Sequence, residues 1–304
     1  MMKHKISLPS SLFLWGVICA IFTLAGCGKS TSQPSSSPTS FSSPLPSTQT
    51  AAPPTVTNEP LAAIVNGENI TQEQYQAELT RYQSAIGTEM ATEDKQRVLD
   101  DLIDQTLLAQ AAVESGFLVD DQLVQQRFDE LVKNLGSRNA LDSWLQTNGY
   151  DELSFKKDLR RAIAAAWMRD QITNRVPQEM EQVHARQILL YNSESANKTL
   201  EQLRNGVDFA KLAAEYDPIT YGDLGWFPRG YLLDEKLEEV IFNLPPGSYS
   251  DIIQTSAGFH IVQVIERDGQ RPLDAAIRLS LQEKALQDWI AERRLDSQIQ
   301  IISS

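Results

Sequence analysis

The segment from Ile219 to Ile265 constrains the fold of this chain more than any other. Residues 234–243 have the spacing of an amphipathic helix, and residues 259–267 alternate as a β-strand does. Glycine and proline mark three turns between such elements, at 222–225, 245–247 and 256–258. A helix and short strands separated by tight turns indicate a small antiparallel sheet flanked by helices, and so an α+β fold.

The residues before this segment extend the same pattern. Residues 183–190 predict another strand, and residues 193–205 and 209–215 predict two helices. A further strand is expected over residues 249–255. We therefore place the boundaries of this α+β domain at residues 181–270.

Residues 61–180 are predicted to form a helical domain. It opens with a short strand, Ala62–Val65, that runs into a tight Asn66-Gly67 turn. Thr71 with Gln74 three residues later is a capping box, and Asp120 is expected to cap a later helix. The apolar spacing then predicts helices at about 71–86, 92–115, 120–132, 141–145 and 151–173.

The chain returns to helix beyond Pro272, because apolar residues recur at helical spacing from Ile277 to Ile290. Ile299–Ile301 predicts a last strand. Residues 271–304 therefore form a third region, a C-terminal helix expected to return to the helical domain.

The first residues resemble a bacterial lipoprotein signal. Lys3 and Lys5 precede an apolar run of about 14 residues, too short for a comfortable membrane span. Leu24-Ala25-Gly26-Cys27 ends this run, so residues 1–26 are expected to be cut off and Cys27 lipidated. An ordinary secretory signal with a chance Cys is the alternative. Residues 27–60, rich in Ser, Thr and Pro, are expected to be a disordered tether.

Composition excludes several other functions. The chain has only two Cys, and neither would remain as a free thiol after cleavage and lipidation, so no disulfide, Cys-ligated metal or thiol nucleophile is expected. A net charge of -13 argues against nucleic acid as a partner. The chain lacks the residues that a hydrolase or a zinc site needs, since His184 and His260 are the only histidines after the signal. No metal or other cofactor is expected.

The pattern from the first strand of the α+β domain to Arg267 resembles the parvulin-type peptidyl-prolyl isomerases. The resemblance rests on Gly222-Asp223-Leu224-Gly225-Trp226-Phe227, the acidic helix, and Gly258-Phe259-His260-Ile261. It implies a polar floor and an apolar pocket for proline. Residues at matching positions are His260 and Thr255 for the floor, and Leu232, Leu237, Phe259 and Phe227 for substrate binding. A buried, hydrogen-bonded core histidine is the alternative for His260.

Two positions depart from the family pattern. Gln187 replaces a His that pairs with the residue at position 260, although an amide can still donate to it or accept from it. The stretch between Tyr216 and Gly222 is shorter than usual. Asp217 is the nearest counterpart of the polar residue that faces the amide there, and a solvated turn residue is an equal alternative.

The helical region resembles the chaperone domain of SurA/PrsA-type foldases, in its Val65-Asn66-Gly67-Glu68 start and its order of elements. That resemblance implies a helical domain with the parvulin-like domain inserted in it. A helical bundle of unspecified use remains the alternative.

Together the two resemblances imply an extracytoplasmic, membrane-anchored foldase of the bacterial cell envelope that isomerises X–Pro bonds. Its partners would be unfolded or nascent secreted chains and, through the lipid, a membrane. Residues 181–270 hold 7 Lys or Arg against 14 Asp or Glu, so a phosphate-specific ligand is not expected. A non-catalytic holdase with a degenerate parvulin domain is the alternative.

Overall fold

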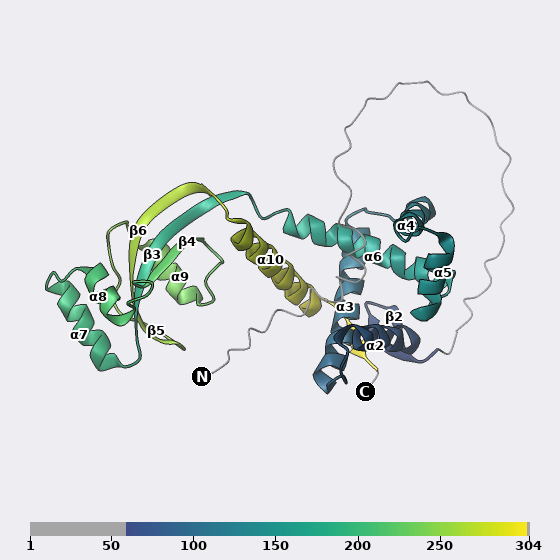
Figure 1. Cartoon of the computed structure of the whole chain (residues 1–304), viewed down its shortest axis with the longest axis horizontal. Coiled ribbons are helices and arrows are strands. Elements are labelled where there is room, and N and C mark those ends of the chain that lie inside the picture. Colours follow the sequence, from purple (N-terminus) through teal and green to yellow (C-terminus); the bar gives the residue numbers. More distant parts are fainter. Residues whose placement is uncertain (1–58, 303–304) are drawn as a thin grey trace, which may run out of the picture. The chain divides into compact units, whose positions relative to one another are not determined.

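The computed structural model describes residues 59–302, which form two compact units (Figure 1). The first unit takes the described residues up to Met168 and those from Arg293 onward, and the second takes Arg169–Glu292. The chain enters the second unit within helix α6 (Glu152–Thr173) and leaves it within helix α10 (Ala275–Leu295). The signal peptide and Cys27, with the tether up to residue 58, lie outside the described residues.

A three-stranded sheet opens and closes the first unit. Strand β1 (Leu61–Val65) lies between β2 (Glu68–Thr71) and β7 (Ile299–Ile301) and is antiparallel to both. Asn66 and Gly67 have φ angles of 51° and 84°, the left-handed values that a tight hairpin turn requires. The expected first strand, its tight turn and the last strand are therefore confirmed, while β2 was not predicted.

The helices of the first unit are α2 (Gln72–Ile86), α3 (Thr92–Glu114), α4 (Asp121–Asn134), α5 (Arg138–Thr147) and most of α6. Helices α2 and α4 follow the two predicted capping residues, and α5 is longer than the helix expected at 141–145. The Thr71 hydroxyl accepts the Gln74 N–H at 3.2 Å and Gln74 Oε1 accepts the Thr71 N–H at 3.1 Å, which confirms the capping box. Asp120 Oδ1 accepts the Leu123 N–H at 2.8 Å and caps α4 as expected.

Arg294, at the end of α10, binds two carboxylates of α3 within this unit. Arg294 donates through Nε to Asp104 Oδ1 at 2.5 Å and through a terminal nitrogen to Asp100 Oδ1 at 3.0 Å. The carboxyl of Asp101, beside them, has a buried Oδ2 with no hydrogen-bond partner among residues 59–302. Burial, and then the negative charge of Asp104, raise the pKa of Asp101 to about 7.

A four-stranded antiparallel sheet forms the centre of the second unit. Its order is β4 (Asp223–Pro228), β3 (Glu179–Leu190), β6 (Gly258–Pro272) and β5 (Ile253–Thr255). Helices cover both faces (Figure 1). One apolar core joins the sheet to α7 (Ser193–Arg204) and α8 (Phe209–Tyr216), and another joins it to α9 (Glu235–Asn243). The expected α+β class is confirmed.

Several strand predictions were wrong in extent. The strand expected over residues 249–255 is reduced to β5, and Tyr249 makes only an isolated bridge to Gln263. Strands β3 and β6 run further than their residue patterns suggest, because they pair with one another as far as Glu179 and Pro272. Strand β4 was missed, since Gly222 before it and Gly225 and Pro228 within it are typical of a turn, but its pairing with β3 makes it a strand.

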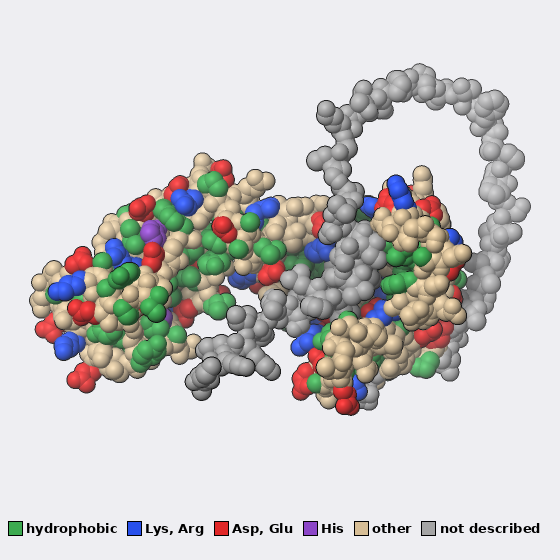
Figure 2. Space-filling view, viewed as in Figure 1, with side chains coloured by type: hydrophobic (Ala, Val, Ile, Leu, Met, Phe, Trp, Pro, Cys, Tyr) green, Lys and Arg blue, Asp and Glu red, His purple; other side chains and the backbone are tan. Residues whose placement is uncertain are grey.

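On the visible face of the second unit, hydrophobic side chains lie among side chains of both charges (Figure 2). None of the helices formed by residues 59–302 combines the length and apolar character that a membrane crossing requires.

Candidate functional site

The candidate site lies on the face of the four-stranded sheet that α9 covers. Side chains alternate between the faces along each strand, so His260 shares this face with Val262 and Val264, which belong to the core under α9. His260 is directly opposite Leu189 on β3 and Ile253 on β5. Its side chain is held in the middle of the sheet and is only 5% exposed.

A chain of hydrogen bonds satisfies both nitrogens of the His260 ring. Nδ1 lies 2.9 Å from Gln187 Oε1, and Nε2 lies 2.8 Å from Thr255 Oγ1. Because an amide oxygen only accepts, Nδ1 carries the proton, and the Thr255 hydroxyl donates to Nε2. That hydroxyl in turn accepts the Ala257 N–H at 3.1 Å. The structure thus brings together three of the four residues expected to form the catalytic floor.

Burial lowers the pKa of His260, because the charged ring would lose its hydration. The negative charge of Asp234 opposes this effect in part. A neutral ring matches the hydrogen bonds described above, since Nε2 must be free to accept from Thr255. The arrangement is a fixed, uncharged polar surface.

Gly222 sets the position of Gln187. The Gln187 N–H donates to the Gly222 carbonyl at 2.8 Å, which ties β3 to the turn before β4. Gly222 has φ +69°, and a Cβ at this residue would lie 2.0 Å from the Gln187 carbonyl oxygen. Only glycine fits this close approach. The glycine turn therefore fixes the backbone from which the Gln187 side chain reaches His260.

Leucine side chains form the apolar part of the site. Leu237 on α9 is 8% exposed and packs in the same core as Ile253 and Val262. Leu232, in the loop before α9, is partly buried against that core. Leu224 on β4 packs there as well and was missed by the sequence interpretation, which treated its segment only as a turn. The polar chain and these aliphatic groups thus share one face of the sheet.

Glu238 is a second residue that the sequence interpretation missed. Its carboxylate accepts three backbone N–H groups, from Gly230 at 2.8 Å and from Tyr231 and Leu232 at 3.1 Å each. One helix residue therefore fixes the loop that carries Leu232. The signal in the sequence was its place directly after Leu237, on a helix expected to border the pocket.

Three expected site residues have other places in the structure. Phe259 lies on the opposite face, in the core with α7 and α8, because it is adjacent to His260 on a strand whose side chains alternate. Phe227 is on the correct face but is fully buried against Phe242 and offers no surface to a ligand. Asp217 is a turn residue, since its carboxylate accepts the N–H groups of Ile219 and Thr220 at 3.1 Å each.

His184 is separate from this network. Its Nε2 lies 2.8 Å from Asp223 Oδ1, and its ring stacks on Trp226. Asp223 Oδ1 also accepts the Gly225 N–H at 2.8 Å, which fixes the turn as expected. His184 thus supports the turn before β4. It does not take the role of the family histidine whose position is occupied by Gln187 in this chain.

The helical unit and the sheet with its buried polar chain define a two-unit α+β protein of the foldase class. The family model of the SurA-like N-terminal domain matches residues 1–169, and that of the PPIC-type PPIASE domain matches residues 172–268. The chain belongs to the SurA-like family and carries a PPIC-type peptidyl-prolyl isomerase domain, as the sequence patterns indicate.

Named relatives agree with this assignment. Foldase protein PrsA of Caldanaerobacter subterraneus subsp. tengcongensis is 29% identical over 230 residues, which cover 67% of this chain and 72% of the relative. Chaperone SurA of Nitrosococcus oceani is 25% identical over 211 residues, or 58% of this chain and 49% of the relative. The crystal structure of a peptidylprolyl isomerase (PrsA) from Bacillus cereus covers 79% of this chain and 91% of its own, at 19% identity and a TM-score of 0.46.

Proposed function

We propose that this protein is an active prolyl isomerase and foldase that works outside the cytoplasm, anchored to a membrane through Cys27. The observation that carries the catalytic part is the complete hydrogen-bonded chain from Thr255 through His260 to Gln187, on the same face as Leu232 and Leu237. The amide of Gln187 occupies the place where the family has a histidine, and it makes the corresponding bond to His260.

The chemistry needs no bond to be broken. Rotation about an X–Pro bond has a barrier of about 18–20 kcal/mol, which comes from amide resonance. A surface that binds the twisted amide better than the planar one lowers this barrier. In our proposal the leucines hold the proline ring, and the neutral polar chain stabilises the carbonyl or nitrogen of the twisted amide. Because these groups are already fixed, they need not reorganise as the bond turns.

The substrates we propose are extended, unmodified, proline-containing segments of unfolded secreted or envelope proteins. The family assignment and the names of the relatives support a foldase or chaperone role. The excess of acidic over basic residues in 181–270 disfavours phosphorylated segments. The localisation rests on the lipoprotein-like signal that ends in Cys27.

The domain division expected from the sequence completes the proposal. The helical domain of residues 61–180, joined by the C-terminal region 271–304, would hold unfolded chains, while residues 181–270 act on proline. The assignment of Arg293 and later residues to the helical unit supports this division for the end of the C-terminal region, whereas residues 169–180 and 271–292 fall in the other unit.

The second candidate function is a holdase that has lost catalysis, and Gln187 together with the short stretch before Gly222 favours it. Refolding of a secreted protein whose slow phase is prolyl isomerisation separates the two. An active isomerase shortens that phase at catalytic amounts. A holdase suppresses aggregation at equimolar amounts and leaves the slow phase unchanged.

A further inference from the structure

A groove of about 780 Å³ lies in the first unit, whereas the candidate isomerase site belongs to the second. It is lined by the second half of α3, the loop after it, and α6, and also by residues of the β1–β2 turn. This volume lies within the range of about 300–1,000 Å³ that is usual for ligand sites. The two long walls differ in chemistry.

The wall formed by α6 is basic. Lys157, Arg160 and Arg161 recur at i, i+3 and i+4, so they lie on one stripe of the helix, and all three line the groove. Lys157 is exposed and has no ion-pair partner within residues 59–302. Arg160 pairs with Asp121, but this pair is solvent-exposed and so easily exchanged. Two cations are therefore accessible to an incoming anion.

The two acidic residues of the groove are already engaged. Glu114 pairs with Arg293, and Glu68 Oε2 accepts from Gln110 Nε2 at 3.1 Å. Three basic and two acidic side chains line the groove, although the net charge of the whole chain is -13.

The side formed by α3 and the following loop adds two exposed aliphatic side chains to its polar Gln110 and Glu114. Val113 at the end of α3 is 53% exposed, and Leu118 in the following loop is 73% exposed. The floor holds the buried alanines Ala109 and Ala164, which leave room between the helices. Exposed aliphatic groups beside a hollow are typical of a surface that binds a partner.

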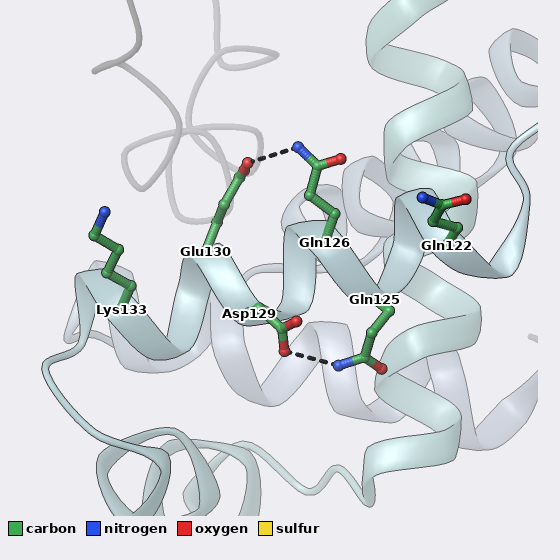
Figure 3. A pocket seen from close by; sticks show the side chains of 6 residues that line it. All are labelled: Gln122, Gln125, Gln126, Asp129, Glu130 and Lys133. Carbon is green, nitrogen blue, oxygen red and sulfur yellow. Dashed lines mark hydrogen bonds between the residues drawn. The ribbon is translucent and has the colours of Figure 1, made fainter.

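A second concave surface, on α4, differs in each of these respects (Figure 3). It is lined only by polar and charged side chains from one helix. Several of these side chains satisfy one another, as in the bonds from Gln125 to Asp129 at 2.7 Å and from Gln126 to Glu130 at 3.2 Å. Its lining side chains include no apolar ones, so a substitution on this surface is a suitable control.

We propose that the groove between α3 and α6 binds extended polypeptide segments in which aliphatic side chains alternate with carboxylates. The aliphatic groups would pack on Val113 and Leu118 while the carboxylates pair with Lys157 and Arg160. This inference rests on the proposed function in one respect, that unfolded chains are the ligands. It adds a preference for acidic, aliphatic segments, which do not need to contain proline.

The preference for acidic segments is expected at the groove and not over the rest of the negatively charged chain. At physiological ionic strength, exposed charges further apart than about 8 Å are largely screened. Acidic segments therefore gain from the basic stripe at contact distance, while the distant acidic surface repels them only weakly. Nucleic acid and anionic membranes, which need extended basic surfaces, are disfavoured by the same overall charge.

Binding of labelled, proline-free peptides to the full-length protein in detergent tests the proposal. The first peptide alternates Leu with Glu, and the second alternates Leu with Lys. We expect the Glu peptide to bind more tightly, and its affinity to fall about tenfold or more in Lys157→Glu/Arg160→Glu. Val113→Ser/Leu118→Ser should weaken both peptides, since it removes the two exposed aliphatic side chains. Higher salt should weaken only the Glu peptide.

Matched variants show whether the loss is specific. Lys133→Glu makes the same kind of charge change on the α4 surface, and Leu153→Ser removes an aliphatic side chain that is 81% exposed outside the groove. Both should bind the Glu peptide like the parent. Equal affinity for both peptides, or equal losses in the groove and control variants, would overturn the proposal.

A proline peptide assayed in parallel keeps this test separate from the proposed isomerase. If the groove variants isomerise it like the parent and keep the parent's circular dichroism spectrum, both units are folded, and their loss of Glu-peptide binding supports the groove. If the parent isomerises the proline peptide but does not bind the Glu peptide, the groove proposal fails and the isomerase proposal stands.

Discussion

The Nδ1 of His260 on β6 lies 2.9 Å from the Oε1 of Gln187 on β3. This bond joins two central strands of the sheet beneath α9 and fixes the proton of the imidazole on Nδ1. Nε2 is then left to accept from Thr255. A substitution at Gln187 should therefore act on catalysis through the orientation of His260 and Thr255.

Replacing Gln187 tests this relationship. Gln187→Leu keeps much of the volume but leaves the His260 N–H unsatisfied, which costs about 1–3 kcal/mol. We expect kcat/KM for a proline peptide to fall about tenfold or more, while Gln187→His retains activity. Gln254→Leu, on the exposed side of β5, is the matched control and should leave kcat/KM unchanged. Parent-like activity of Gln187→Leu would show that this bond does not matter for catalysis.

The leucine positions should affect binding more than His260 does. We expect Leu232→Ala and Leu237→Ala to weaken proline-peptide binding more than His260→Ala, as measured by NMR shift titration. Leu237 is buried, so its truncation should also cost about 2–5 kcal/mol of stability, and Leu232→Ala is the cleaner probe. Leu233, which is fully exposed beside them, is the control. Equal binding by the parent and all variants would contradict the assignment of Leu232 and Leu237 to the proline pocket.

Glu238 should act as a positioning residue. Glu238→Ala removes the acceptor of three backbone N–H groups and frees the loop that carries Leu232. We expect KM for the proline peptide to rise several-fold with a smaller change in kcat, and amide signals of residues 230–232 to broaden. Glu239→Ala, an exposed neighbour on α9, should change neither property. A fall in kcat alone would place Glu238 in a different role.

The pH dependence follows from the neutral state of His260. Burial holds its pKa below the usual 6.5, so the ring stays neutral at and above neutral pH. We expect the isomerisation rate to be flat from about pH 6.5 to 8 and to fall in acid, when Nε2 becomes protonated. The folded state then binds fewer protons than the unfolded state, so the free energy of unfolding should decline below about pH 6.5. An NMR titration midpoint of His260 above 6.5 would contradict this.

Asp101 should destabilise the helical unit at high pH. Its pKa is raised to about 7, so the folded state holds a proton that the unfolded state loses near pH 4. Stability should therefore fall as pH rises from about 4 to 7. Asp101→Asn removes this slope, and at pH 8 it should raise Tm, by about 2–4 °C for each kcal/mol recovered. Asp296→Asn, at an exposed residue of the same unit, should leave the slope unchanged.

Much of the fold could be predicted because local signals and tertiary structure agree. The Asn66-Gly67 turn and the capping box at Thr71 are set by residues a few positions apart, and both were predicted. Strand β7 was also predicted, although its partner β1 lies at the other end of the chain. The missed strand β4 shows the limit. Gly222 before it and Gly225 within it favour turns, and only its pairing with β3 makes it a strand.

The site was predicted in part for a related reason. Motif positions correctly placed His260, Thr255 and Gln187 together, since pairing of β3, β5 and β6 brings them into reach. Phe259 was assigned to the wrong face, although the alternation that put His260 with Val262 already excluded it. Glu238 was missed because its role depends on a loop folding back over the start of α9, and its place beside Leu237 did not by itself indicate that contact.

The rate of cis/trans exchange in a short Ala-Pro-Phe peptide, measured by NMR with the full-length protein in detergent, tests the central claim most directly. Parent protein and Leu232→Ala/Leu237→Ala are compared, with Leu233→Ala as the control. We predict that parent and control accelerate exchange and that the double variant, still folded by circular dichroism, does not. A folded parent that binds the peptide without accelerating exchange would contradict the proposed isomerase activity and favour the holdase function.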